Sequence, residues 1–148
     1  MTAFASESWV DAWWTSLRSD DRVRDAAVAW VHGPWLLVIE ADAKAGLTET
    51  IAIRMDIHAG EIRDLRLSSV DAMARTPWTF AGAYPRWKAL LGGTGSLLDS
   101  ITDGRVRSTG DLPELHRHDV LVSSVLANAA ALNTAWPEAP APVAAGAR

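Results

Sequence analysis

The sequence predicts an α+β domain in which helices cover one face of a mainly antiparallel sheet. Apolar residues recur at helical spacing in residues 9–17, close to the N-terminus. They alternate with polar residues in 51–57, which is the period of a strand with one buried face. Helical spacing returns in 119–133. A helix, then a run of strands, then further helices is the order expected of such a layered domain.

The first half of the chain is expected to form one helix and four strands. The segment "SESWVDAWWTSLRS" places its apolar residues on one broad helical face. Residues 26–31 alternate, and "HGP" separates them from the apolar run "WLLVIEA", which predicts two strands joined by a turn. Residues 51–57 and "RDLRL" predict a hairpin, with Ile62 out of phase at a bulge or at the end of the turn.

The next segments predict one strand and two short helices. A loop or short helical piece around "SVDAMAR" leads to a strand over 78–82. Pro85 suits the first turn of a helix that stops at the glycine pair of "GGTGS". Ser96 followed by Asp99 resembles a capping box and opens the second helix, "LLDSI".

One strand and a long helix are expected to complete the domain. The segment "RVRST" alternates like a strand, and Asp111 with Glu114 resembles another capping box that opens a turn or helix. Leu121, Val122 and Val125 begin the apolar stripe of a helix over 119–133. Residues 137–148 hold three Pro and five Ala, which predicts a disordered or extended tail.

Length and composition exclude several classes of function. At 148 residues the chain suits one domain, expected over 1–136. It has no Cys, so disulfides and thiol chemistry are excluded, and its net charge of −4 disfavours nucleic acid as a partner. No apolar run approaches the 18 residues of a membrane span and no secretion signal is visible, which predicts a cytoplasmic protein without integral membrane insertion.

The polar motifs are weak signals of chemistry. The "GGTGS" segment lacks the Lys-Ser/Thr of a phosphate loop and is expected to be a linker. In "HRHD", His116 and His118 would point to opposite sides of a helix, so surface histidines are favoured over a metal site or a general base. His32 and His58 lie beside glycine-containing turns and are expected to be solvated.

Four consecutive segments resemble the sterol-carrier-protein family of small lipid-binding domains: "WTFAG", "AYPRWKALLGG", "SLLDSI" and "GRVRSTGDL". The likeness covers residues 76–115 well and the remainder loosely. It implies a sheet of about five strands with helices on one face and an apolar tunnel between the layers. It also implies that 1–136 is a lipid-binding domain for sterols, fatty acids, acyl-CoA or similar molecules, which needs no metal, cofactor or catalytic group.

Three functions remain open at this point. The first is a non-enzymatic carrier of a hydrophobic small molecule. The second is an isomerase, cyclase or hydrolase that uses His116, His118, Asp119 or an arginine of "GRVR" in the same cavity. The third is a homodimeric interaction module that exposes Trp9, Trp14 or Trp136. For the carrier, the residues expected to line the cavity are Trp13, Met55, Trp78, Phe80, Trp87, Leu98, Leu121 and Val125.

Overall fold

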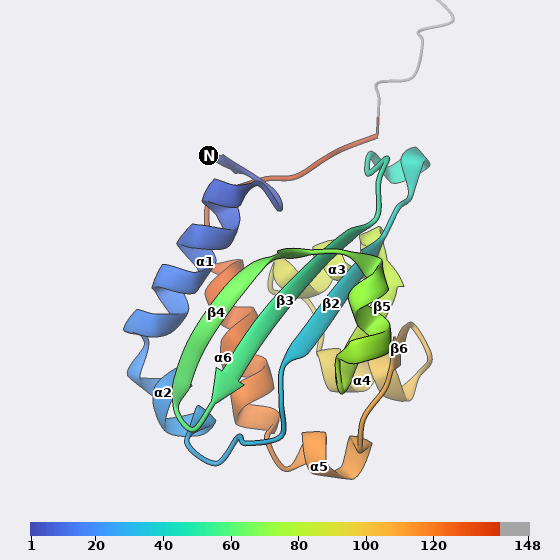
Figure 1. Ribbon diagram of the computed structural model, residues 1–148. Coiled ribbons are helices and arrows are strands. Elements are labelled where there is room, and N and C mark those ends of the chain that lie inside the picture. Colours follow the sequence, from blue (N-terminus) through green and yellow to red (C-terminus); the bar gives the residue numbers. More distant parts are fainter. Residues whose placement is uncertain (140–148) are drawn as a thin grey trace, which may run out of the picture.

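A computed structural model describes residues 1–139 of the chain (Figure 1). Its central feature is a five-stranded sheet with the strand order β4-β3-β2-β5-β6. The strands are β2 (Trp35–Glu40), β3 (Ile51–His58), β4 (Glu61–Ser68), β5 (Trp78–Ala83) and β6 (Val106–Ser108). The expected α+β class and the expected number of strands are therefore confirmed.

The sheet is mixed rather than wholly antiparallel. Three of its four strand pairings are antiparallel, and β2 pairs with β5 in parallel. The parallel pairing arises because the β3–β4 hairpin occupies one side of β2. The 3₁₀ helix η2 (Val70–Arg75) then carries the chain to the other side of β2.

Within residues 1–139, six α-helices pack with the sheet. The N-caps at Ser6, Ser96 and Asp111 each accept a hydrogen bond from the backbone N–H three residues later, as the capping motifs of the sequence predict for the last two. A short 3₁₀ helix η1 (Ala43–Ala45) follows β2, and β1 (Thr2–Ala3) pairs in parallel with β7 (Thr134–Ala135). The helices are α1 (Glu7–Ser19), α2 (Asp21–Ala27), α3 (Tyr84–Leu91), α4 (Leu97–Thr102), α5 (Leu112–His116) and α6 (Asp119–Ala130).

Both faces of the sheet are covered, although unequally. On one face Trp35, Leu37 and Ile39 of β2 join the main apolar core with residues from all six helices. On the other face Leu36 and Val38 pack with Ala72 of η2 in a smaller cluster. Because side chains alternate along a strand, this double cover explains why β2 is apolar at five consecutive positions.

The strand expected over 26–31 does not form. Instead the Asp20 carboxylate accepts a hydrogen bond from the N–H of Arg22 and caps α2, which runs as far as Ala27. A tight loop follows, in which the N–H of Trp30 donates to the carbonyl of Ala27. A short run of Ala and Val satisfies a strand pattern and a helix pattern equally well, and here the cap at Asp20 selects the helix.

The irregularity at Ile62 is a β-bulge. The register of β3 and β4 shifts between Asp56, which faces Asp64, and Ile57, which faces Ile62. Arg63 is the additional residue, and its guanidinium forms an ion pair with Asp56. The bulge keeps Ile62 and Leu65 buried on the same side, which strict alternation would not allow.

The C-terminal segment leaves the domain beside α3. The hydroxyl of Tyr84 donates a hydrogen bond of 2.6 Å to the carbonyl of Pro137. The segment expected to be a disordered or extended tail therefore begins in contact with the domain. Its remaining part, 140–148, lies outside the described residues.

Candidate functional site

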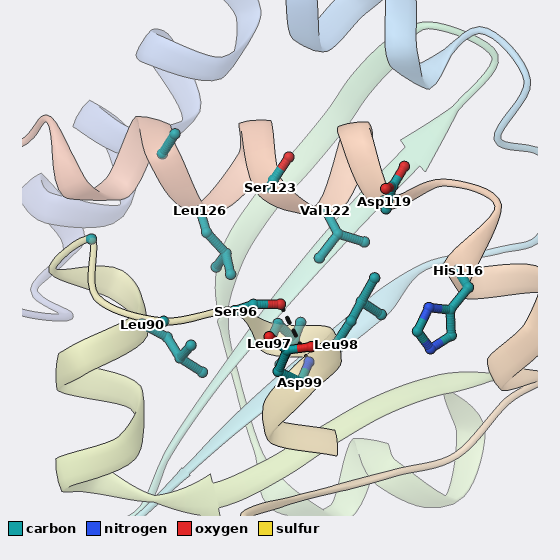
Figure 2. Close-up of a pocket in the computed structure, with 13 residues that line it drawn as sticks. Leu90, Ser96, Leu97, Leu98, Asp99, His116, Asp119, Val122, Ser123 and Leu126 are labelled. Atoms are coloured by element: carbon teal, nitrogen blue, oxygen red, sulfur yellow. Dashed lines mark hydrogen bonds between the residues drawn. The ribbon is translucent and has the colours of Figure 1, made fainter. Parts of the chain in front are cut away.

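A cleft of about 430 Å³ lies between α4 and α6, beside the glycine-rich link from α3 to α4 (Figure 2). Leu97 and Leu98 of α4 face Val122 and Leu126 of α6 across it, and Leu90 of α3 closes one end. Polar groups from Ser96, Asp99, His116, Asp119 and Ser123 surround this apolar floor. The cleft thus offers an apolar interior with a polar rim, which is the usual character of a small-molecule site.

The two walls of the cleft follow from the helical periodicity. On α6, Val122 and Leu126 are one turn apart and buried, whereas Ser123 and Ala127 lie one position further on and are exposed at the cleft. The sequence identifies this apolar stripe but places it in the core. Its additional role as a cleft wall depends on where α4 lies.

The "GGTGS" segment is the link between α3 and α4. Gly93 and Gly95 have φ angles of +96° and +84°, which favour glycine over any other residue. Ser96 then caps α4 by accepting a hydrogen bond of 3.3 Å from the N–H of Asp99 (Figure 2). The glycines are explained by backbone geometry, in agreement with a linker.

His116 and His118 lie in different surroundings. His116, at the end of α5, lines the cleft together with Asp119, the first residue of α6 (Figure 2). His118 instead faces Trp30, with 4.9 Å between the ring centroids. The cleft therefore carries one imidazole, of His116, and two carboxylates, of Asp99 and Asp119, that could exchange protons with a bound molecule.

The eight residues expected to line a tunnel are all buried. Each belongs to the main apolar core, with exposed fractions of 8% or less. Leu98 alone among them borders the cleft, and Leu121 borders a second, shallow hollow between α2 and α6. Leu98 therefore lies in both the core and the cleft.

The buried tryptophans are anchored by their indole N–H groups, with one exception. Trp13 donates to the carbonyl of Val125, and Trp87 donates to the carbonyl of Val38. Trp30 and Trp78 likewise donate to backbone carbonyls. The Nε1–H of Trp35 is buried and has no hydrogen-bond partner among the described residues. A buried N–H without a partner is uncommon and marks a position where a polar atom could be bound.

Two of the three tryptophans suggested for a dimer interface, Trp9 and Trp14, form hydrogen bonds within the chain. Trp9 was expected to be exposed, but it is fully buried and its Nε1 donates to the hydroxyl of Thr134, so that expectation is wrong. Trp14 donates to the carbonyl of Ile62 and lies under the guanidinium of Arg18. Packing of the first helix against β4 and α6 buries Trp9 and leaves Trp14 partly exposed.

A second cluster of functional groups joins Glu114 of α5 and His118, the N-cap of α6, to His32. The Glu114 carboxylate lies 2.9 Å from Nε2 of His32 and 3.4 Å from Nε2 of His118, both measured to Oε1. Its other oxygen pairs with Arg117 at 2.5 Å. The hydrogen bond from Arg117 lowers the pKa of the Glu114 carboxyl below its usual value, and the hydrogen bond with His118 has a smaller effect in the same direction. Sequence analysis missed this cluster because His32 lies far from the other two residues along the chain.

Comparison of three-dimensional structures supplies an independent view of the fold. A crystal structure of sterol carrier protein 2 superposes with a TM-score of 0.75 at 20% sequence identity, covering 87% of this chain and 98% of the other. The chain has the sterol carrier protein 2 fold. The resemblance carried by residues 76–115 is thus confirmed for the fold over most of the chain.

Two further structures share the sterol carrier protein 2 fold. The solution structure of a conserved hypothetical protein of Thermus thermophilus, named as a candidate sterol carrier protein, gives a TM-score of 0.75 at 21% identity and covers 88% of this chain and 90% of the other. Sterol carrier protein 2 from Yarrowia lipolytica, in its apo form, gives a TM-score of 0.55 at 12% identity and covers 89% of this chain and 97% of the other.

No family model and no curated protein matches the sequence. None of the helices in residues 1–139 combines the length and hydrophobicity that a membrane crossing needs.

Proposed function

We propose that this chain is a non-enzymatic carrier or binding domain for a hydrophobic small molecule such as a sterol, a fatty acid or an acyl-CoA. The observation that carries the proposal is the apolar cleft between α4 and α6 in a chain with the sterol carrier protein 2 fold. Its volume of about 430 Å³ lies in the range of small-molecule sites, roughly 300–1,000 Å³. The polar rim suits a ligand with one polar end.

The energetics favour such a ligand without any charged anchor. Each buried methylene contributes about 0.8 kcal/mol, so ten methylenes contribute roughly 8 kcal/mol. That corresponds to an affinity of about 1 μM before ordering costs. An apolar ligand can therefore be held by the cleft and the side chains behind it.

Leu98 borders the cleft and also belongs to the main apolar core. The floor side chains are themselves almost fully buried, so a long ligand has to displace α4 or its glycine link to gain apolar contact. Displacing Leu98 would bring the ligand towards Trp13, Trp87 and the other core residues expected to line a tunnel. The Nε1–H of Trp35, which belongs to the same core and has no partner among the described residues, could bind a hydroxyl or carbonyl of the ligand.

A cleft-filling substitution tests the proposal. Ala127 is exposed at the cleft, so Ala127→Trp is expected to weaken binding of a fluorescent fatty acid, followed by the emission of the fatty acid itself, at least tenfold. Ser8→Trp on the exposed face of α1 is the matched control and should bind like the wild type. Absence of saturable binding of fatty acid, sterol and acyl-CoA to the wild type would overturn the proposal.

An enzyme that uses the same cleft is the second candidate, because His116 and Asp119 both lie on its rim. An imidazole and a carboxylate on the rim of one cleft suit proton transfer in ester or thioester hydrolysis, or in isomerisation. Turnover of an acyl ester that His116→Ala abolishes, while fatty-acid binding is retained, would favour the enzyme over the carrier. Equal background hydrolysis by both proteins would remove this candidate.

A further inference from the structure

We propose that His32, Glu114 and His118 form a binding site for a divalent transition-metal cation of the Zn²⁺ type. The three ligand atoms lie within 4.8 Å of one another, which is close enough for one ion to contact all three. The site is separate from the cleft between α4 and α6 and does not depend on the carrier proposal. This proposal differs from the sequence-based expectation of no metal site. That expectation rested on His116 and His118, which would point to opposite sides of a helix.

The distances fit a metal of this size. In a tetrahedral zinc site, bonds of about 2.0–2.1 Å place neighbouring ligand atoms roughly 3.3 Å apart. Oε1 of Glu114 lies 2.9 Å from Nε2 of His32 and 3.4 Å from Nε2 of His118. A small rotation of the two rings is therefore enough to admit the ion.

Each ligand is positioned by the fold rather than by the others. The turn that joins α5 to α6 keeps helical hydrogen bonds, such as the N–H of His118 to the carbonyl of Leu115, so Glu114 and His118 lie one turn apart on one side. The main chain at His32 is fixed because its carbonyl accepts the indole N–H of Trp78 at 2.9 Å. The loop that carries His32 and the segment that carries Glu114 and His118 are each fixed by their own backbone contacts.

The surroundings provide the outer shell that metal ligands normally have. The second oxygen of Glu114 is held by Arg117, which directs Oε1 towards the two imidazoles, in the orientation that a shared metal would need. The buried indole of Trp30 lies edge-on to both imidazoles, with ring centroids 5.1 Å from His32 and 4.9 Å from His118. This packing limits the rotation of both rings and keeps bulk water away from one side.

The donor set selects the class of cation. Two imidazoles and one carboxylate suit Zn²⁺ and its neighbours in the first transition row, whereas Mg²⁺ and Ca²⁺ prefer oxygen ligands alone. With three protein ligands, a fourth position remains for water. The His32 side chain is one-third exposed, so solvent can reach the ion from that side.

Calorimetric titration of the untagged protein with Zn²⁺ tests the site. We expect one ion per chain, and we expect His32→Ala, Glu114→Gln and His118→Ala each to weaken binding at least a hundredfold. His58→Ala and His116→Ala are matched controls that remove an imidazole outside the cluster and should bind Zn²⁺ like the wild type. Mg²⁺ should not compete.

Ring signals of the four histidines, observed by NMR in the wild type, give a second readout that needs no variant to fold. Addition of Zn²⁺ should shift the signals of His32 and His118 and leave those of His58 and His116 unchanged. Absence of saturable binding up to about 100 μM Zn²⁺, or equal shifts of all four rings, would overturn the proposal and leave the cluster as an ion pair only.

Discussion

The side-chain amide of Asn128 on α6 donates a hydrogen bond of 3.0 Å to the carboxylate of Asp20, the residue that caps α2. The same amide nitrogen donates to the carbonyl of Ser124, and its oxygen accepts a hydrogen bond from the hydroxyl of Ser16. One largely buried side chain therefore ties α1, the start of α2 and α6 together. The Asn128 hydrogen bond is also the main reason why the pKa of Asp20 lies below its usual value.

Asn128→Ala is expected to lower the free energy of unfolding by about 1–3 kcal/mol, because it removes these hydrogen bonds from a buried position. Asn128→Asp should cost more, since it places a second negative charge beside Asp20. Denaturation with urea measures both. Asn133→Ala, at an exposed position just after the helix, is the control and should change stability little; a loss equal to that of Asn128→Ala would contradict the assignment.

Trp35→Phe and Trp87→Phe are expected to differ in cost although both replace a buried indole by the same smaller ring. Trp87 loses its hydrogen bond to the carbonyl of Val38, whereas the indole N–H of Trp35 has no partner in residues 1–139. Trp87→Phe should therefore be less stable than Trp35→Phe by about 1–3 kcal/mol in chemical denaturation. Equal losses would indicate that the Trp35 N–H is satisfied in solution by a bound polar atom.

The only tyrosine of the chain, Tyr84, is expected to titrate above its usual range in the folded protein. Burial raises the pKa of the Tyr84 hydroxyl, and the negative charge of Glu138 adds to the effect. A raised folded pKa means that this group contributes stability below about pH 10 and loses it as the pH rises further.

Ultraviolet absorbance of the phenolate follows this titration directly, because there is a single tyrosine. Tyr84→Phe should lose the hydrogen bond to Pro137 and show a weaker fall in stability above about pH 10 than the wild type. A phenolate that appears at the ordinary pKa while the protein is still folded would show that the Tyr84 hydroxyl is not buried.

Gly110→Ala is expected to be more damaging than Gly104→Ala. Both glycines have positive φ angles, +102° and +83°, so each alanine should cost about 1–2 kcal/mol of backbone strain. A Cβ at Gly110 would also lie 2.4 Å from the ring of Trp78, whereas nothing lies within 4 Å of one at Gly104. Overpacking of this kind adds about 1–3 kcal/mol, which thermal unfolding of the two variants can resolve.

The candidate cleft was only partly visible in the sequence. Leu98 was expected at a ligand site, and Val122 was recognised as part of an apolar stripe, because helical spacing shows which side of a helix is apolar. The spacing does not show that α4 and α6 leave a gap between them. His116 was favoured as a surface residue, with a role in a cavity as the alternative, and it is an exposed residue on the rim of the cleft.

The sequence by itself determined the local elements: the caps at Ser96 and Asp111, the strand over 51–57, an irregularity at Ile62 and the order of segments that carries the sterol carrier protein 2 fold. Only the tertiary structure decided the parallel pairing of β2 with β5, the cover of the second sheet face by η2, and the meeting of His32 with Glu114 and His118. The physical reason is that periodicity and capping are interactions between residues a few positions apart. Strand partners and clusters of distant side chains are instead set by packing between elements, which leaves no mark on the local pattern.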